Sequence, residues 1–136
     1  MRKLFIAAFM FVSAFTTNSF ADGHAIKMGI ILGFTGPIES LTPAMAASAE
    51  LAFKEASDSG SLLGGKYIKA ERADSTCVYS AAATTAAEGL IAGGVVAIMG
   101  ADCSGVTGAI ATNAAVPNGV VMISPVSYTH LTLPTI

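Results

Sequence analysis

The sequence predicts an α/β protein with an open parallel sheet and helices on both of its faces. Apolar runs of strand length alternate along the chain with segments of helical periodicity. The first run, Ala25–Leu32, has too few polar positions for a strand with one face in water, which is typical of a strand buried on both faces. Because a helix connects each pair of successive strands, those strands are expected to be parallel, with right-handed crossovers.

Glycine, proline and N-cap signals set the bounds of each expected element. The first helix is the most clearly marked, since Thr42 is a good N-cap, Pro43 suits the first helical position and Gly60 ends the helix. We expect strands over Ala25–Leu32, Lys66–Arg72, Val95–Met99 and Val120–Ile123. We expect helices over Thr42–Ser59, Val78–Ala92 and Ser104–Ala115.

Residues 1–21 have the layout of a secretory signal peptide. Arg2 and Lys3 precede an apolar run of about a dozen residues, and Ser19 and Ala21 are the small residues that a signal peptidase reads. We predict cleavage before Asp22, which would release the mature chain into the periplasm. A retained membrane anchor is the alternative, although the run is short for a membrane span.

Both cysteines, Cys77 and Cys103, lie in the part that would be exported. An even count in an oxidising compartment favours a disulfide. In the loop-entropy model, closing a loop of roughly 26 residues contributes about 3 kcal/mol. Two buried free thiols, or a metal or catalytic role, are the alternatives. The spacing fits no zinc pattern and contains no C-x-x-C.

The composition argues against a nucleic-acid partner, and no motif indicates an enzyme or a cofactor. The net charge is -2, and no basic patch follows Lys3. The segment 33–37 (GFTGP) follows a strand but lacks the glycine and lysine pattern of a phosphate loop. Ser104 lies between a strand and a helix but not in G-x-S-x-G, and His24 is the one histidine between residues 22 and 125.

The predicted topology places a binding site at the carboxyl ends of the strands. The loops at these ends are expected over Gly33–Leu41, Asp74–Cys77 and Gly100–Ser104. A hydroxyl at a helix N-terminus, beside unpaired backbone N–H groups, suits a carboxylate, so we predict Ser104 as a ligand-binding residue. Ser104 could instead act only as an N-cap, and the two roles are compatible.

The last residues do not continue the alternation. Val126–Ile136 (VSYTHLTLPTI) has no glycine and no charge, and it resembles the translation of a sequencing adapter. We therefore predict a non-native tail over 126–136 and a partial domain over 22–125. Four strands need neighbours at both sheet edges, so we expect this piece to be marginally stable or aggregation-prone when expressed alone.

Four segments, taken in order, resemble the leucine/isoleucine/valine-binding protein family of type I periplasmic solute-binding proteins. They read KMGIILGFTGP, SAELAFKEASDSGSLLGGKYIKAERADSTC, GLIAGGVVAIMGADCSG and PNGVVMISP, and the resemblance covers Ile26–Pro125. It implies a partial N-terminal lobe with a Rossmann-like sheet, from a two-lobed protein that closes around an amino acid and delivers it to the membrane permease of an ABC importer. It also implies that Cys77 and Cys103 pair, and that the Ser104 hydroxyl holds the α-carboxylate of the ligand.

One position departs from the family pattern. Leu41 stands where several members of the family carry an aromatic residue against the ligand, so we predict Leu41 as an apolar ligand contact and leave the ligand open. A sensing module of the same fold, or a Rossmann-like enzyme without visible catalytic residues, are the alternatives to a transport receptor.

Overall fold

The computed structural model describes residues 25–126, which form a parallel α/β sheet. The predicted signal peptide 1–21, and all of the predicted tail 126–136 except Val126, lie outside the described residues. The strands are β1 (Ala25–Leu32), β2 (Tyr67–Asp74), β3 (Ala97–Gly100) and β4 (Val121–Ile123). The helices are α1 (Thr42–Asp58), α2 (Ser80–Ala92) and α3 (Ser104–Ile110). Short helical turns follow α1 at Leu62–Gly64 and α3 at Ala111–Ala115.

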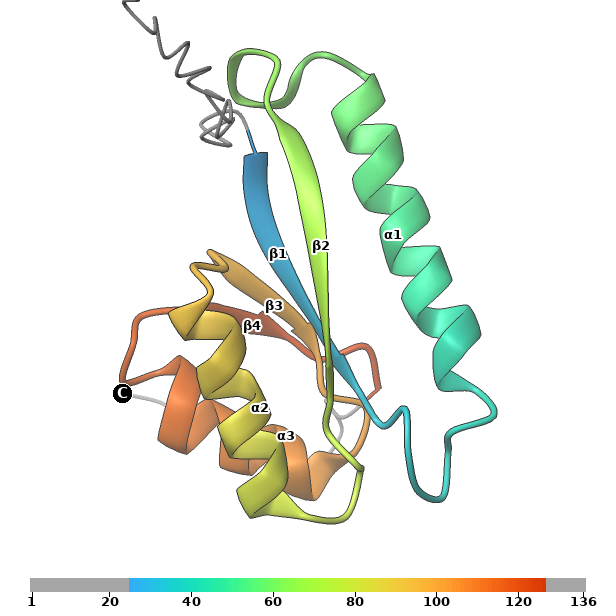
Figure 1. The fold of residues 1–136 in the computed structure, drawn as a ribbon, viewed down its shortest axis with the longest axis vertical. Coiled ribbons are helices and arrows are strands. Elements are labelled where there is room, and N and C mark those ends of the chain that lie inside the picture. Colours follow the sequence, from blue (N-terminus) through green and yellow to red (C-terminus); the bar gives the residue numbers. More distant parts are fainter. Residues whose placement is uncertain (1–24, 127–136) are drawn as a thin grey trace, which may run out of the picture.

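The strands lie in the order β2-β1-β3-β4, and each neighbouring pair is parallel. α1 lies on one side of the sheet, and α2 and α3 lie on the other, as Figure 1 shows. The predicted parallel α/β sheet with helices on both faces is therefore confirmed. From β1 the chain goes first to β2 on one side and then to β3 on the other. The carboxyl ends of β1 and β3 thus flank the point where the strand order reverses, which is where ligands bind in open α/β sheets.

Two apolar clusters fill the two faces, and β1 supplies both of them. Ile31 belongs to the cluster with α2 and α3, whereas Ile30 and Leu32 pack against α1, and all three side chains are fully buried. This follows from the alternation of side chains along a strand. It also explains why Ala25–Leu32 reads as a continuous apolar run.

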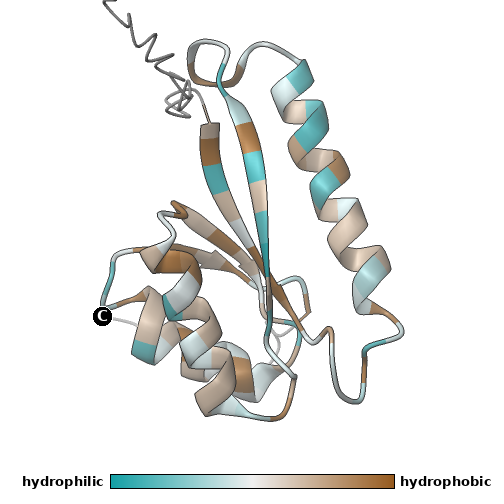
Figure 2. Cartoon of the chain, in the orientation of Figure 1, coloured by the Kyte–Doolittle hydropathy of each residue, from teal (hydrophilic) through white to brown (hydrophobic). Residues whose placement is uncertain are grey.

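The face of the sheet on which α1 lies is covered only in part. α1 lies against β1 and β2, while Val121 and Ile123 of β4 are 61% and 64% exposed. Figure 2 shows apolar residues along β3 and β4, and polar residues spaced along α1 and β2. Within the described part of the chain, no helix is long and apolar enough to cross a membrane.

The predicted element bounds hold to within about two residues, with one change of helix type. The helix predicted over Ser104–Ala115 is α-helical only to Ile110 and then forms a π-helical turn. The N–H group of Val116, which ends that turn, donates to the carbonyl of Ala111, five residues earlier, and the N–H group of Val120 donates in the same way to the carbonyl of Ala115.

Candidate functional site

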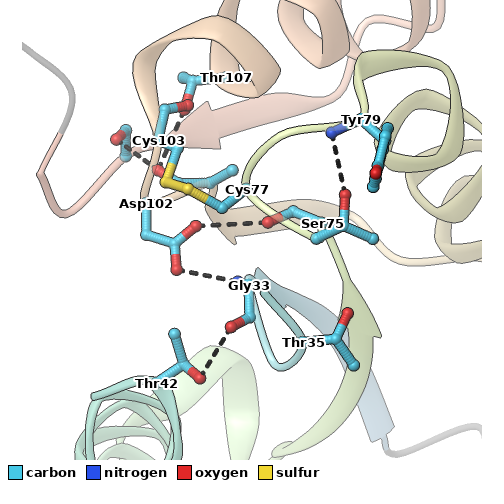
Figure 3. Close-up of a disulfide and its surroundings, with 12 residues drawn as sticks. Gly33, Thr35, Thr42, Ser75, Cys77, Tyr79, Asp102, Cys103 and Thr107 are labelled. Carbon is cyan, nitrogen blue, oxygen red and sulfur yellow. Dashed lines mark hydrogen bonds between the residues drawn. A yellow bond between two sulfur atoms is a disulfide. The ribbon is translucent and has the colours of Figure 1, made fainter. Parts of the chain in front are cut away.

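The loops that follow β1, β2 and β3 meet at the carboxyl edge of the sheet. A disulfide joins Cys77, three residues after β2, to Cys103, three residues after β3, with their Cα atoms 5.3 Å apart (Figure 3). The predicted disulfide is confirmed. Cys77 adopts a left-handed backbone with φ of 67°, so the second loop turns sharply at the crosslink.

Asp102 connects the same three loops by hydrogen bonds. Its side chain is buried and accepts one hydrogen bond from the Gly33 backbone N–H at 2.8 Å and another from the Ser75 hydroxyl at 3.3 Å (Figure 3). The Ser75 backbone N–H in turn donates to the Leu32 carbonyl at 2.8 Å. A buried carboxylate is tolerated when hydrogen-bond donors surround it, and here two of the donors come from other loops.

Asp74, the last residue of β2, holds the first loop from the other side. It accepts hydrogen bonds from the Thr35 hydroxyl at 2.5 Å and from the Thr76 backbone N–H at 2.8 Å. Partial burial alone would raise the pKa of this carboxyl. The hydrogen bonds from Thr35, Thr76 and the Phe34 backbone outweigh that effect and keep the pKa of Asp74 below its ordinary value.

Thr42 does not act as the predicted N-cap, because Leu41 occupies the cap position. The Thr42 side chain is fully buried, and its hydroxyl donates to the carbonyls of Gly33, at 3.1 Å, and Glu39, at 3.3 Å. The residue therefore links the first turn of α1 to the end of β1. The Thr42 hydroxyl is used in these two bonds, and it accepts no hydrogen bond from a backbone N–H of α1.

The end of β3 passes very close to β1. Gly100 has φ of 133°, and a Cβ on this residue would lie 1.9 Å from the Ile31 carbonyl oxygen. Only glycine fits such an approach. The next carbonyl, that of Ala101, accepts hydrogen bonds from the hydroxyls of Thr107 and Ser124. The loop that leads to Ser104 is thus held from several directions.

The structure brings Ser104 to this edge as an exposed residue. Cys103 occupies the N-cap position of α3, and Ser104 is the first helical residue. No hydrogen bond within residues 25–126 uses the Ser104 hydroxyl. The alternative that Ser104 is only an N-cap is therefore wrong for this structure. Its binding role stays a prediction.

Leu41 lies at the start of α1, after the loop that follows β1, and is 60% exposed. Val78 and Tyr79, which follow the crosslinked Cys77, are also exposed at 55% and 69%. The carboxyl edge of the sheet therefore has exposed apolar side chains beside its buried polar contacts. Sequence reasoning did not identify Asp102 or Ser75, although an aspartate directly after a buried strand is a signal that could have indicated the first.

The described residues also form a pocket that these three loops do not line. This pocket of about 300 Å³ lies between α2 and the sheet, lined by Lys27, Glu71, Arg72 and Leu90 among others. Its Lys27 ammonium already donates to the Gly93 carbonyl at the end of α2, and neither Ser104 nor Leu41 lines the pocket. In the described residues, no group of three or more histidine, cysteine, aspartate or glutamate side chains could hold a metal ion.

The fold is a parallel α/β sheet whose loops are crosslinked at the carboxyl edge beside the strand-order reversal, which is where ligands bind in open α/β sheets. Residues 25–134 match the family model described as periplasmic binding protein. The chain belongs to this family, whose members are substrate-binding proteins. The match extends into 126–134, and the non-native tail stays a prediction. No curated protein sequence matches the chain.

Several solved structures of similar fold are substrate-binding or solute-binding proteins, and some of them are named as parts of ABC transporters. The branched-chain amino acid protein LivJ from Streptococcus pneumoniae, in complex with isoleucine, is 30% identical with a TM-score of 0.67, and the match covers 75% of this chain and 29% of LivJ. The leucine-binding protein LivK from Thermotoga maritima is 26% identical with a TM-score of 0.64, over 74% of this chain and 27% of LivK. A solute-binding protein from R. palustris, in complex with benzoate, is 27% identical with a TM-score of 0.63, over 76% and 28% of the two chains. The present chain thus spans less than a third of each.

Proposed function

We propose that this chain is part of the N-terminal lobe of an extracytoplasmic substrate-binding protein that captures an amino acid and delivers it to the permease of an ABC importer. The observation that carries the proposal is the exposed Ser104 hydroxyl, which has no hydrogen bond within residues 25–126, on a loop fixed by a disulfide at the strand-order reversal. The signal peptide predicted over residues 1–21 agrees with export to the periplasm.

A carboxylate is the ligand group that this edge suits best. The ligands named for two of the similar structures, isoleucine and benzoate, share a carboxylate and differ in the rest. Ser104 begins α3, where backbone N–H groups are not yet used by the helix, so its hydroxyl and those N–H groups can donate to the same anion. The exposed Leu41 lies at the same edge, and in this proposal its side chain contacts an apolar part of the ligand.

The direct test uses the full-length protein from the complete gene. Thermal-shift screening and calorimetry against amino acids and simple carboxylates should reveal a ligand, since a ligand at 100 times its Kd adds about 2.7 kcal/mol of apparent stability. Ser104→Ala should weaken binding by about 1.5–3 kcal/mol, because a hydrogen bond to a charged group is lost.

Ser80→Ala is the matched control. Ser80 is also an exposed first residue of a helix, α2, that follows a strand of the same sheet. This variant should bind like the parent. Equal affinity of the parent and Ser104→Ala would remove Ser104 from the site, and a parent that binds no carboxylate would contradict the proposed function.

A further inference from the structure

We infer that Asp102 is the positioning residue of the binding edge, holding the loop after β1 in register with the start of α3; this inference rests on the proposed function. Asp102 is 6% exposed and lies two residues before Ser104. Its two carboxylate oxygens bind different loops, one through the Gly33 N–H and the other through the Ser75 hydroxyl.

The glycine at position 33 makes this contact close. A Cβ on Gly33 would lie 3.2 Å from the Cys77 Cβ and 3.5 Å from Oδ2 of Asp102. The end of β1 therefore lies close to both the Cys77 side chain and the Asp102 carboxylate. The hydrogen bond from the Gly33 N–H to Asp102 would be broken if the end of β1 shifted along the sheet.

The disulfide and Asp102 have different tasks in this arrangement. The disulfide links the loop after β2 to the loop after β3, and it does not include the loop after β1. Asp74 and the Ser75 N–H join the end of β1 and its loop to the end of β2. Asp102 joins that loop to the loop after β3 through Gly33, the first residue after β1. Since the proposed ligand lies between the ends of β1 and β3, the contact of Asp102 with Gly33 sets the spacing of the two sides that the ligand meets.

Two replacements of Asp102 distinguish the effect of its hydrogen bonds from the effect of its size. Asp102→Leu replaces the carboxylate with an apolar side chain of similar size and leaves the buried Gly33 N–H without its acceptor. Asp102→Asn keeps one acceptor oxygen for that N–H, and its amide can donate to the Ser75 oxygen. A positioning role therefore predicts loss in the first variant and rescue in the second.

Ligand affinity in the full-length protein is the first readout. We expect Asp102→Leu to weaken binding of the carboxylate ligand at least about tenfold, and Asp102→Asn to bind within about threefold of the parent. The control is Val95→Ala, a truncation of the buried core just before β3. It should lower the melting temperature and leave the affinity unchanged. Parent-like binding by Asp102→Leu, or equal losses in both Asp102 variants, would overturn the inference.

Hydrogen exchange at the Gly33 amide is the second readout and needs no ligand. We expect slow exchange in the parent and in Asp102→Asn, and exchange faster by at least about tenfold in Asp102→Leu. Unchanged exchange would overturn the inference. If the parent binds no carboxylate, the proposed function fails, whereas the Gly33 amide still tests the contact made by Asp102.

If Asp102→Leu does not fold, Ser75→Ala tests the same inference with a smaller change to the buried contacts. It removes the contact at 3.3 Å and leaves the one to Gly33. We expect about a threefold loss of affinity with the Gly33 amide still protected. A loss of Gly33 protection in this variant would show that the carboxylate is not held by Gly33 and would overturn the inference.

Discussion

The two ends of the same sheet are built in different ways. At the carboxyl end, a disulfide, two aspartates and a buried threonine join the loops to one another. At the amino end, the chain turns at glycines with positive φ, and a Cβ would meet nothing within 4 Å at Gly64, Gly65, Gly94 or Gly119. Side-chain contacts at that end include an exposed one, from Lys27 Nζ to the Gly93 carbonyl, and a partly buried one, from the Ile68 backbone N–H to the Ser57 hydroxyl.

This difference shows where precise loop positions are required. Buried polar contacts are costly unless every partner is placed correctly, so their concentration at one end agrees with the binding site proposed there. Turns at the other end need only reverse the chain. The same sheet therefore has one end whose loops are joined by buried contacts and one end whose turns have open space around their glycines.

The largest expected effect comes from comparing glycines at the two ends. Gly100→Ala would place a Cβ 1.9 Å from the Ile31 carbonyl oxygen, so we expect loss of soluble folded protein. Gly94→Ala meets no neighbour and should cost about 1–3 kcal/mol for its positive φ alone. Soluble yield and circular dichroism of the full-length variants measure both. Similar yields for the two variants would contradict the proposed close fit at the carboxyl end.

Removal of the disulfide is the next largest change. The double variant Cys77→Ser, Cys103→Ser should lose about 3 kcal/mol of unfolding free energy, because the unfolded chain is no longer crosslinked. Lys27→Met, which removes an exposed contact at the amino end, should lose less than about 1 kcal/mol. Urea unfolding measures both. Equal losses of unfolding free energy in the two variants would contradict the proposed difference between the carboxyl and amino ends of the sheet.

Much of this arrangement was predictable from the sequence. Apolar runs such as Ala25–Leu32 and punctuation such as Gly60 are local signals, and local signals predicted the order and type of the main elements. The pairing of Cys77 with Cys103 was predictable because only two cysteines are present.

The polar contacts of the carboxyl end were not predictable, because they depend on how distant loops meet. Asp102 binds Gly33, 69 residues away, and Thr42 turned out to donate to Gly33 instead of capping α1. The N-cap preference of threonine is worth about 1 kcal/mol, which a buried hydrogen bond can match. The change from α- to π-helix at Ala111 has no local signal that we can identify.

A smaller, pH-dependent effect should separate Asp74 from an exposed carboxylate. The pKa of Asp74 is held below its ordinary value of 3.8, so its contribution to stability is present above that pH and is lost as the pH falls through the folded-state pKa. Asp74→Asn should therefore be less stable at pH 7 and show a weaker loss of stability in acid. Urea midpoints measured between neutral and acidic pH give the result.

Glu50 is the control for that series. The hydrogen bond from Arg72 also lowers the pKa of Glu50, but this pair lies on the surface. Glu50→Gln should change stability by less than about 1 kcal/mol, and high salt should reduce the change further. A larger pH effect from Glu50 than from Asp74 would contradict the assignment of fixed polar contacts to the carboxyl end.

The smallest effect on stability is expected at β4, an edge strand of the described sheet. Val121 and Ile123 are exposed, so replacing both with threonine should change the unfolding free energy by no more than about 0.5 kcal/mol. The same change should reduce association of the isolated 22–125 segment, because an apolar edge strand is a template for pairing with other chains. Light scattering measures the association. If the unsubstituted 22–125 segment stays monomeric and melts in one cooperative step, the expected marginal stability is contradicted. That result would mean that the contacts at the carboxyl end are enough to stabilise the sheet.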